Sequence, residues 1–177
     1  MLRLKSPQSE RLFQSPALEA TFGGGEANVA VSLALLGKKA SFVTALPDNP
    51  IAGAALGELR KHGVDVSRVR FSPGRLGVYF LENGANQRAS NVVYDRDGSS
   101  VSRVAPGDFD WQTIFRGARW FHVTGITPAI SAGAASVSFE AVRAAKEAGC
   151  TVSIDLNYRK KLWQYGKKAV EVMPELV

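Results

Sequence analysis

The pattern of hydrophobic and polar positions divides this chain into two α/β stretches with a different stretch between them. Up to about residue 63, and again from about residue 110, short apolar runs alternate with longer segments whose apolar residues recur at helical spacing. Such alternation predicts a mostly parallel sheet with helices on both faces. Between them, segments rich in β-branched and aromatic residues are separated by Pro-Gly, Asn-Gly and Asp-Gly pairs. This middle pattern predicts a small antiparallel sheet inserted into the α/β chain.

The boundaries of the predicted elements follow from capping and turn residues. Strands are expected at 19–22, 40–46, 119–123 and 150–155, and helices at 27–36, 51–62, 110–115, 131–148 and 166–173. The inserted sheet is expected to use 66–71, 77–82 and 89–95. Asn49 and Pro50 suit a helix start, and Gly37 and Gly63 suit helix ends. Because 27–36 is almost wholly apolar, we expect that helix to be buried.

The composition is that of a globular protein, since 45% of the 177 residues are hydrophobic and 21% are charged. No apolar run approaches the ~18 to 20 residues that cross a bilayer, so no membrane partner is expected. The first residues lack an apolar signal segment, which argues against secretion if Met1 is the true start. Cys150 is the only cysteine, so no internal disulfide is possible and a cytoplasmic location is favoured. One Cys and two separated His argue against a zinc site.

The charge balance is basic, with 22 Lys and Arg against 16 Asp and Glu. A net charge of +6 is compatible with nucleic acid, anionic lipid or a small anion as partner. The basic residues form no long block, because the densest cluster is only 159–161 followed by 167–168. We therefore favour a solvated surface with a pocket for a small anion, and expect no nucleic-acid partner.

A glycine-rich turn joins the strand at 19–22 to the helix that follows. Gly23 and Gly25 fit a dinucleotide-binding fingerprint, but Asn28 stands where that fingerprint requires Gly or Ala. Two interpretations remain beside that one: a tight turn that packs the helix on a sheet, or a ligand turn. In a ligand turn the glycines let the backbone approach closely, and Asn28 can donate to and accept from a hydroxyl. No Walker A sequence and no Gly-x-Ser-x-Gly elbow occurs.

Two further polar groups are candidates for ligand contacts. Tyr94 and Arg96 are two positions apart in a predicted strand and share a face, and with Tyr79 they could clamp a carboxylate or phosphate. The alternative is a surface strand with a Tyr–Arg stack. At the end of the strand at 150–155, Asn157 and Arg159 alternate with apolar positions at the sheet edge where ligands gather. The alternative there is a helix cap plus a solvated arginine.

Taken together, these features resemble the ribokinase-type (PfkB) carbohydrate kinases, and within that family the 2-keto-3-deoxygluconate kinases most of all. The resemblance covers about residues 1–168. It is carried by GGGEANVA at 23–30 with Gly37 behind it, LPDNP at 46–50, GVY at 77–79, YDR at 94–96, GITP at 125–128 and DLNYR at 155–159.

The resemblance implies a ribokinase-like, three-layer α/β/α fold with a mostly parallel sheet and a small β-sheet lid. Residues 1–177 would be its N-terminal, sugar-binding part, with lid strands at about 17–23 and 66–96 inserted in it. The implied substrate-binding residues are Gly24, Gly25, Asn28, Tyr79, Tyr94, Arg96 and Arg159. Asn157 and Arg159 would lie on the phosphate side, where the family uses ATP and Mg²⁺. The resemblance also implies a homo-oligomer through the lid strands, with apolar Val78, Phe80 and Val92 pairing across a dimer.

The sequence departs from the family in one important segment. The Gly-Ala-Gly-Asp motif, whose aspartate is the family's general base, is not found. We therefore expect no catalytic residue and no metal ligand in this chain. We also expect a fold incomplete at its C-terminus, lacking the ATP and catalytic part, and little or no phosphoryl transfer by the chain alone.

These expectations lead to one main hypothesis and two alternatives. The main hypothesis is ATP-dependent phosphorylation of a sugar acid, 2-keto-3-deoxygluconate, to its 6-phosphate. One alternative is a sibling kinase that acts on a neutral sugar such as fructose or ribose. The other is a non-catalytic module that binds a sugar acid.

Overall fold

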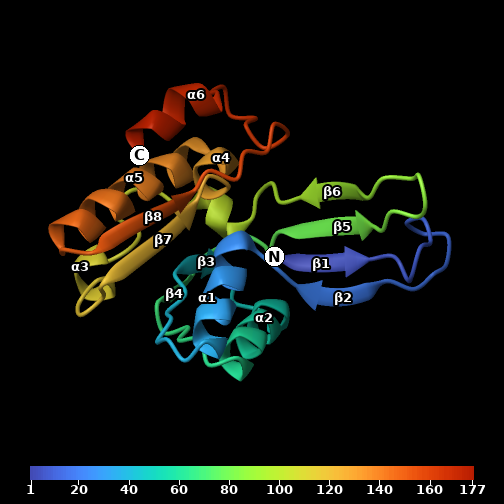
Figure 1. Ribbon diagram of the computed structural model, residues 1–177, viewed down its shortest axis with the longest axis horizontal. Helices are drawn as coiled ribbons and strands as arrows, with labels where there is room; N and C mark the ends of the chain where they lie inside the picture. Colours follow the sequence, from blue (N-terminus) through green and yellow to red (C-terminus); the bar gives the residue numbers. More distant parts are fainter. The chain divides into compact units, whose positions relative to one another are not determined.

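A computed structural model describes residues 1–177 and divides them into two compact units, Met1–Ser100 and Val101–Val177 (Figure 1). Helices alternate with strands in both units, and three of the pairings, β1–β5, β3–β4 and β7–β8, are parallel. The α/β class predicted from the sequence is therefore confirmed. No helix has both the length and the apolar character that crossing a membrane requires.

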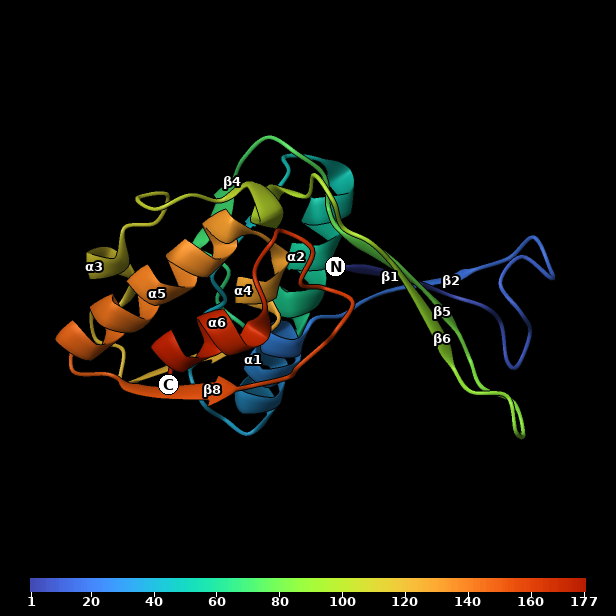
Figure 2. The same cartoon turned by 90° about the horizontal axis from the view of Figure 1, so that it is seen from above.

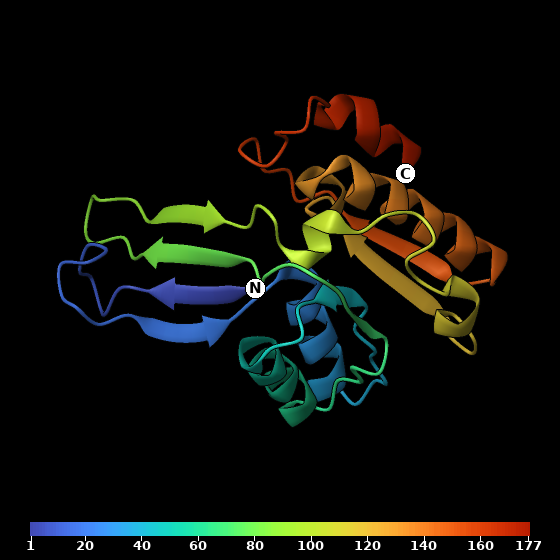
Figure 3. The same cartoon turned by 180° about the vertical axis from the view of Figure 1, so that it is seen from behind.

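A four-stranded sheet dominates the first unit and has the order β2-β1-β5-β6 (Figures 1 and 3). Its strands are β1 (Leu2–Lys5), β2 (Glu19–Phe22), β5 (Val78–Glu82) and β6 (Asn91–Asp95). Strand β1 pairs antiparallel with β2 and parallel with β5, and β5 pairs antiparallel with β6. Arg3, Tyr79 and Tyr94 are direct partners in the register, so their side chains share one face of the sheet.

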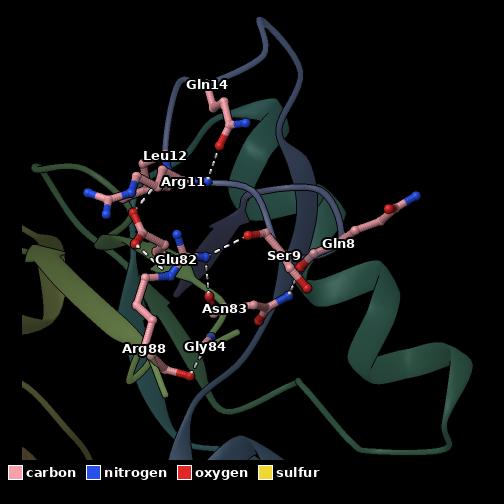
Figure 4. A network of polar contacts seen from close by, with 10 residues as sticks. Gln8, Ser9, Arg11, Leu12, Gln14, Glu82, Asn83, Gly84 and Arg88 are labelled. Atoms are coloured by element: carbon pink, nitrogen blue, oxygen red, sulfur yellow. Dashed lines mark hydrogen bonds and ion pairs between the residues drawn. The ribbon is translucent and has the colours of Figure 1, made fainter. Parts of the chain in front are cut away.

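Two loops at the far end of this sheet are tied to each other by polar contacts (Figure 4). Arg88 donates to the backbone carbonyls of Ser9 and Asn83, at 2.5 and 3.1 Å. The Glu82 carboxylate accepts from the backbone N–H of Leu12 at 3.1 Å and lies 3.8 Å from Arg88. The loop between β1 and β2 is therefore held against the loop between β5 and β6, which keeps the sheet's register fixed at this end.

The rest of the first unit contains α1 (Gly25–Leu35), β3 (Thr44–Leu46), α2 (Pro50–Lys61) and β4 (Val69–Phe71), and the 3-10 helix η1 (Ser100–Arg103) crosses the boundary between the two units. Helix α2 starts as predicted, because Asn49 Oδ1 accepts from Ala52 N at 2.9 Å and Pro50 is its first residue. It ends at Lys61, and Gly63, the residue after its C-cap, has a φ of 80° that suits a residue without a Cβ.

Two predictions about the first unit are wrong. The helix α1 forms and ends at Leu35, two residues before Gly37, but it is not buried: only Ala30 is, whereas Leu35 and the C-cap residue Leu36 are 69% and 74% exposed. The exposure follows from packing, because no other helix or strand makes extensive contact with α1. The predicted lid strand at 66–71 is also misassigned. Strand β4 pairs in parallel with β3 and so belongs to the α/β part.

The second unit is built on a parallel pair, β7 (Trp120–Thr124) and β8 (Thr151–Asp155). Its other elements are α3 (Trp111–Ile114), α4 (Thr127–Ile130), α5 (Ala132–Glu147), α6 (Ala169–Val172) and the 3-10 helix η2 (Met173–Glu175). Helix α5 runs along the pair (Figures 1 and 2). Its start is fixed by Ser131, whose Oγ accepts from Ala134 N at 3.0 Å. Alternate residues of both strands, including Phe121, Val123 and Val152, pack with Val142 of α5 in the core.

The cysteine and one histidine expected to be structural lie in this unit. Cys150 is buried and its thiol contacts the carbonyl of Ala118 at 3.4 Å, which confirms a core thiol. His122 Nδ1 lies 2.8 Å from Ser153 Oγ, and Trp120 donates to the same hydroxyl. The face of β7–β8 away from α5 is therefore lined by a polar cluster with aromatic members.

Candidate functional site

The predicted site residues of the first unit gather at one end of the four-stranded sheet. Tyr79 and Tyr94 lie side by side with ring centroids 6.0 Å apart. The guanidinium carbon of Arg96 lies 4.6 Å from the centroid of the Tyr94 ring, a cation–π distance. Although β6 ends one residue before Arg96, the predicted association of its side chain with Tyr94 is confirmed.

The surroundings of Arg96 make it an unusual arginine. Its side chain is half-buried, and burial lowers the pKa of the guanidinium, while Tyr94, Glu26 and Tyr79 act in the opposite direction. The pKa of a free guanidinium is far above neutrality, so the group stays charged. Its Nε–H is buried without a hydrogen-bond acceptor. Since buried charged donors are normally paired, Arg96 is a cation that lacks a counterpart on this atom.

The glycine turn lies against the same end of the sheet. A Cβ on Gly23 would come within 3.0 Å of the Tyr79 hydroxyl, so this glycine makes room for the phenol. The backbone N–H of Gly23 donates to Met1 O at 3.0 Å, and the Met1 amine donates back to Gly23 O at 2.9 Å. Burial lowers the pKa of that amine to about 6, helped by the nearby charge of Arg96. Gly23 therefore lies between the start of β1, the Tyr79 hydroxyl and the start of α1.

Helix α1 starts within this turn, as the ligand-turn interpretation requires. Gly24 is the N-cap residue, and its carbonyl accepts from the backbone N–H of Asn28 at 2.8 Å. No side chain caps the helix, so the first backbone N–H groups, beginning with that of Gly25, are available to a ligand or water. The Asn28 side chain is exposed. The turn can thus offer backbone donors and one amide to a ligand.

The remaining predicted site residues, Asn157 and Arg159, follow β8 in the second unit. Strand β8 stops at Asp155, because the Asp155 carboxylate accepts from Asn157 N at 3.0 Å and turns the chain. Asn157 has a φ of 35°, in the left-handed region where asparagine is among the few tolerated residues. The predicted strand-like alternation through Asn157 to Arg159 is therefore wrong. Arg159 is exposed, and its carbonyl accepts from Leu162 N at 3.0 Å.

Gly125 fixes this turn from the adjacent strand end. Its N–H donates to Asp155 O at 2.8 Å, and a Cβ on it would lie 2.2 Å from Leu156 O. Only a glycine lets the two backbones come so close. Gly125 opens the GITP segment at 125–128, for which the sequence pattern predicted no individual role. The signal that could have identified it is a glycine directly after an apolar strand, at the edge where the next parallel strand also ends.

The side chains of the chain suit phosphate and sugar better than a metal ion. No group of three or more His, Cys, Asp or Glu side chains is placed to hold a metal. Arginine and asparagine side chains and free backbone N–H groups are instead donors suited to carboxylate, hydroxyl and phosphate oxygens. The site of the first unit can therefore bind an oxygen-rich anion, and the turn after β8 in the second unit carries a guanidinium and an amide of its own.

Comparison with known proteins places this chain among sugar kinases. A family model described as pfkB family carbohydrate kinase matches residues 2–177. The 2-dehydro-3-deoxygalactonokinase of Haloferax volcanii is 39% identical over 163 residues, covering 92% of this chain and 51% of the relative. Probable fructokinase-3 of Arabidopsis thaliana is 33% identical over 159 residues, covering 89% of this chain and 45% of the relative.

Among solved structures, the crystal structure of 2-dehydro-3-deoxygluconokinase from Thermotoga maritima matches with a TM-score of 0.89 and 50% identity. The match covers 92% of this chain and 50% of that one. It confirms the ribokinase-like α/β fold predicted from the sequence. The chain spans about half the length of the curated relatives it matches.

Proposed function

This chain belongs to the pfkB family of carbohydrate kinases, and on that basis we propose that it is the sugar-binding part of a kinase for a sugar acid. The substrate we propose is 2-keto-3-deoxygluconate, also called 2-dehydro-3-deoxygluconate, which the kinase phosphorylates to the 6-phosphate with ATP and Mg²⁺. Relatives whose names state a 2-dehydro-3-deoxy sugar acid kinase support this choice.

The observation that carries the substrate assignment is the state of Arg96. Its guanidinium is half-buried, and its Nε–H has no acceptor in the protein. A neutral sugar could offer that N–H only uncharged oxygens, whereas a carboxylate would add negative charge to that of nearby Glu26 and supply acceptor oxygens. The neighbouring phenols of Tyr79 and Tyr94 are additional donors for the same anion. The cluster therefore suits the carboxylate end of a sugar acid.

The other residues are assigned to the rest of the substrate. We assign the turn of Gly24 and Gly25, with the amide of Asn28, to the hydroxyl and carbonyl oxygens of the sugar. Arg159 is assigned to the substrate carboxylate or the transferring phosphate, and Asn157 to the phosphate side. Their donors match these oxygens, because guanidinium and amide N–H groups pair with carboxylate and phosphate.

Transfer of the phosphate needs groups that the sequence of this chain does not hold. Bound ATP supplies the phosphoryl group, and Mg²⁺ neutralises charge on it. The sugar hydroxyl that attacks must lose a proton, yet no Gly-Ala-Gly-Asp segment occurs to provide the base. What the residues of this chain contribute is orientation of the sugar and charge opposite its carboxylate. We therefore propose that these 177 residues alone bind the sugar acid and transfer little or no phosphate.

Calorimetric titration of this chain tests the assignment. We expect binding of 2-keto-3-deoxygluconate, weaker binding of fructose, and a coupled assay with ATP that shows no robust turnover. Fructose binding at least as tight as that of the sugar acid would favour a neutral-sugar kinase, for which the fructokinase relative is the supporting observation. Sugar-acid binding in a complete protein that neither binds nor uses ATP would favour a non-catalytic binding module.

We also propose that two copies associate through the four-stranded sheet. Val78 and Phe80 share one face with Leu2 and Leu4, and Val93 on that face is 47% exposed. Val92 lies on the opposite face with Tyr79, so it does not belong to this surface. We expect Val93→Glu to convert a dimer to a monomer in light scattering, and Thr21→Glu on the other face to leave it unchanged. A wild-type chain that is monomeric at all accessible concentrations would contradict the proposal.

A further inference from the structure

We propose that Arg75 is a positioning residue that holds Arg96 in place for an anionic sugar. The proposal rests on the proposed function, because it gives Arg96 the substrate carboxylate as its partner. Arg75 does not touch the site cluster itself. It binds both chain neighbours of Arg96, namely the side chain of Asp95 and the backbone of Asp97.

Three donors of one guanidinium make these contacts. Nη1 of Arg75 donates to Asp95 Oδ2 at 3.0 Å, and Nη2 donates to Oδ1 of the same carboxylate. Nε donates to the carbonyl of Asp97 at 2.8 Å. The planar guanidinium thus fixes the residue before Arg96 by a two-point ion pair and the residue after it by a backbone bond, a geometry that lysine cannot reproduce.

The backbone around Arg75 completes the enclosure. Its carbonyl accepts from Ser100 N at 3.0 Å, and Ser99 N donates to Arg96 O at 3.1 Å. On the strand side, a Cβ on Gly77 would come within 3.2 Å of Arg96 Cβ, so the two backbones are in close contact there. Residues 95–100 are therefore tied to residues 75–77 on both sides of Arg96. The Arg96 side chain extends from this tied segment and lies over the Tyr94 ring.

An ordinary surface ion pair is the simpler interpretation of Arg75 and Asp95, whose side chains are 40% and 54% exposed. Exposed pairs contribute little to stability, so the two interpretations agree that breaking the pair leaves the fold nearly as stable. They differ at Arg96. If the pair is an ordinary surface pair, breaking it leaves the order of the Arg96 side chain unchanged. If it is a positioning pair, it sets the position of the Arg96 guanidinium, on which the binding of a charged ligand depends.

The test uses Arg75→Gln, Arg75→Lys and Asp95→Asn in the full 177-residue chain. The matched control is Glu19→Gln, which breaks the 2.7 Å Lys5–Glu19 ion pair in the same sheet. The first readout is ¹⁵N NMR relaxation of the Arg96 Nε–Hε signal without ligand, assigned by its loss in Arg96→Gln. We expect all three variants, Arg75→Lys included, to lower the order parameter of the Arg96 Nε–Hε bond, and the control to leave it as in the wild type. An unchanged signal in Arg75→Gln and Asp95→Asn overturns the proposal.

The second readout separates this proposal from the proposed function. In titrations with 2-keto-3-deoxygluconate and with fructose, we expect Arg75→Gln to weaken the binding of the acid by about tenfold and to change the binding of fructose little. If Arg75→Gln weakens the binding of both sugars equally, or of neither, the positioning role is overturned, while sugar-acid binding by the wild type still stands. If the wild type binds no sugar acid, the proposed function fails, and the NMR signal alone decides whether Arg75 orders Arg96.

Discussion

Gly23 in the first unit and Gly125 in the second both make room for a neighbour, but the neighbours differ in kind. Beside Gly23 the space is taken by the hydroxyl at the end of the Tyr79 side chain, 3.0 Å from where a Cβ would stand. Beside Gly125 it is taken by the backbone carbonyl of Leu156, at 2.2 Å. A side-chain end can rotate away from a new methyl group, whereas a backbone carbonyl can move only with the chain around it.

The difference separates two ways of building a site. The cluster of Tyr79, Tyr94 and Arg96 is set by strand register and side-chain packing, and its contact with Gly23 is made by the end of one side chain, the Tyr79 hydroxyl. The turn that carries Asn157 is set by the backbone contact of Gly125 with Leu156 and by the bond from Asn157 N to the Asp155 carboxylate. Mutations should therefore affect ligand binding first in the one region and stability first in the other.

The largest effect is expected from Gly125→Ala. A methyl group 2.2 Å from a carbonyl oxygen forces the turn after β8 to shift, which should lower the free energy of unfolding by about 2 to 4 kcal/mol. Gly23→Ala should cost less than about 1 kcal/mol, because Tyr79 can move. Urea denaturation measures both. Gly53→Ala is the control: it lies within α2 with open space around it, and should stabilise by about 0.5 to 1 kcal/mol. Equal losses for Gly23→Ala and Gly125→Ala would remove the distinction.

Arg96→Gln should affect binding rather than stability. Loss of a charged hydrogen-bond donor is expected to weaken the binding free energy of 2-keto-3-deoxygluconate by about 1.5 to 3 kcal/mol and to leave that of fructose nearly unchanged. Isothermal titration measures both, and Arg60→Gln near the end of α2 is the matched control for loss of a positive charge. An Arg96→Gln variant that binds the sugar acid as well as the wild type would show that the cluster is not an anion site.

The pH dependence of stability should report the burial of the Met1 amine beside Arg96. Burial lowers the pKa of the amine from 8.0 to about 6, so between these values the unfolded chain binds more protons than the folded one. Stability therefore rises from pH 6 to pH 8, by about 1 to 2 kcal/mol, and is lost as the pH falls through that window. Unfolding free energies at the two pH values measure it. An N-terminally acetylated chain serves as control and should lack this part of the dependence; an identical profile for both chains would contradict the assignment.

The smallest effect is expected from Asn157→Gly. Glycine adopts the φ of 35° without strain, so the variant should be as stable as the wild type or more stable by about 0.5 to 1 kcal/mol. Thermal denaturation measures this, with Asn83→Gly as a control at an asparagine outside the left-handed region. Destabilisation by more than about 1 kcal/mol would mean that the side chain of Asn157, not its conformation, holds the turn.

The sequence was most informative where local chemistry decides the structure. Asn49 with Pro50, and Ser131, mark helix starts that the structure confirms, because caps act within one turn. The Tyr94–Arg96 association was also predictable, since residues two apart on a strand share a face. Pairing partners were not predictable: β4 has the composition of the inserted sheet yet pairs with β3, a choice that depends on distant residues. For the same reason neither Arg75 nor Gly125 could be given a role, because their contacts involve residues 20 to 31 positions away.

Strand β1 lies between β2 and β5, with Leu2 opposite both Phe22 and Val78. The β5–β6 hairpin and the β1–β2 pair can each form from residues close in sequence, but the other edge of β1 must wait for β5, which is synthesised much later. During translation that edge of β1 is thus unpaired and open to association with other chains until residue 82 has emerged from the ribosome. The tyrosine–arginine cluster is complete only after that, so the binding surface is among the last parts of its unit to mature.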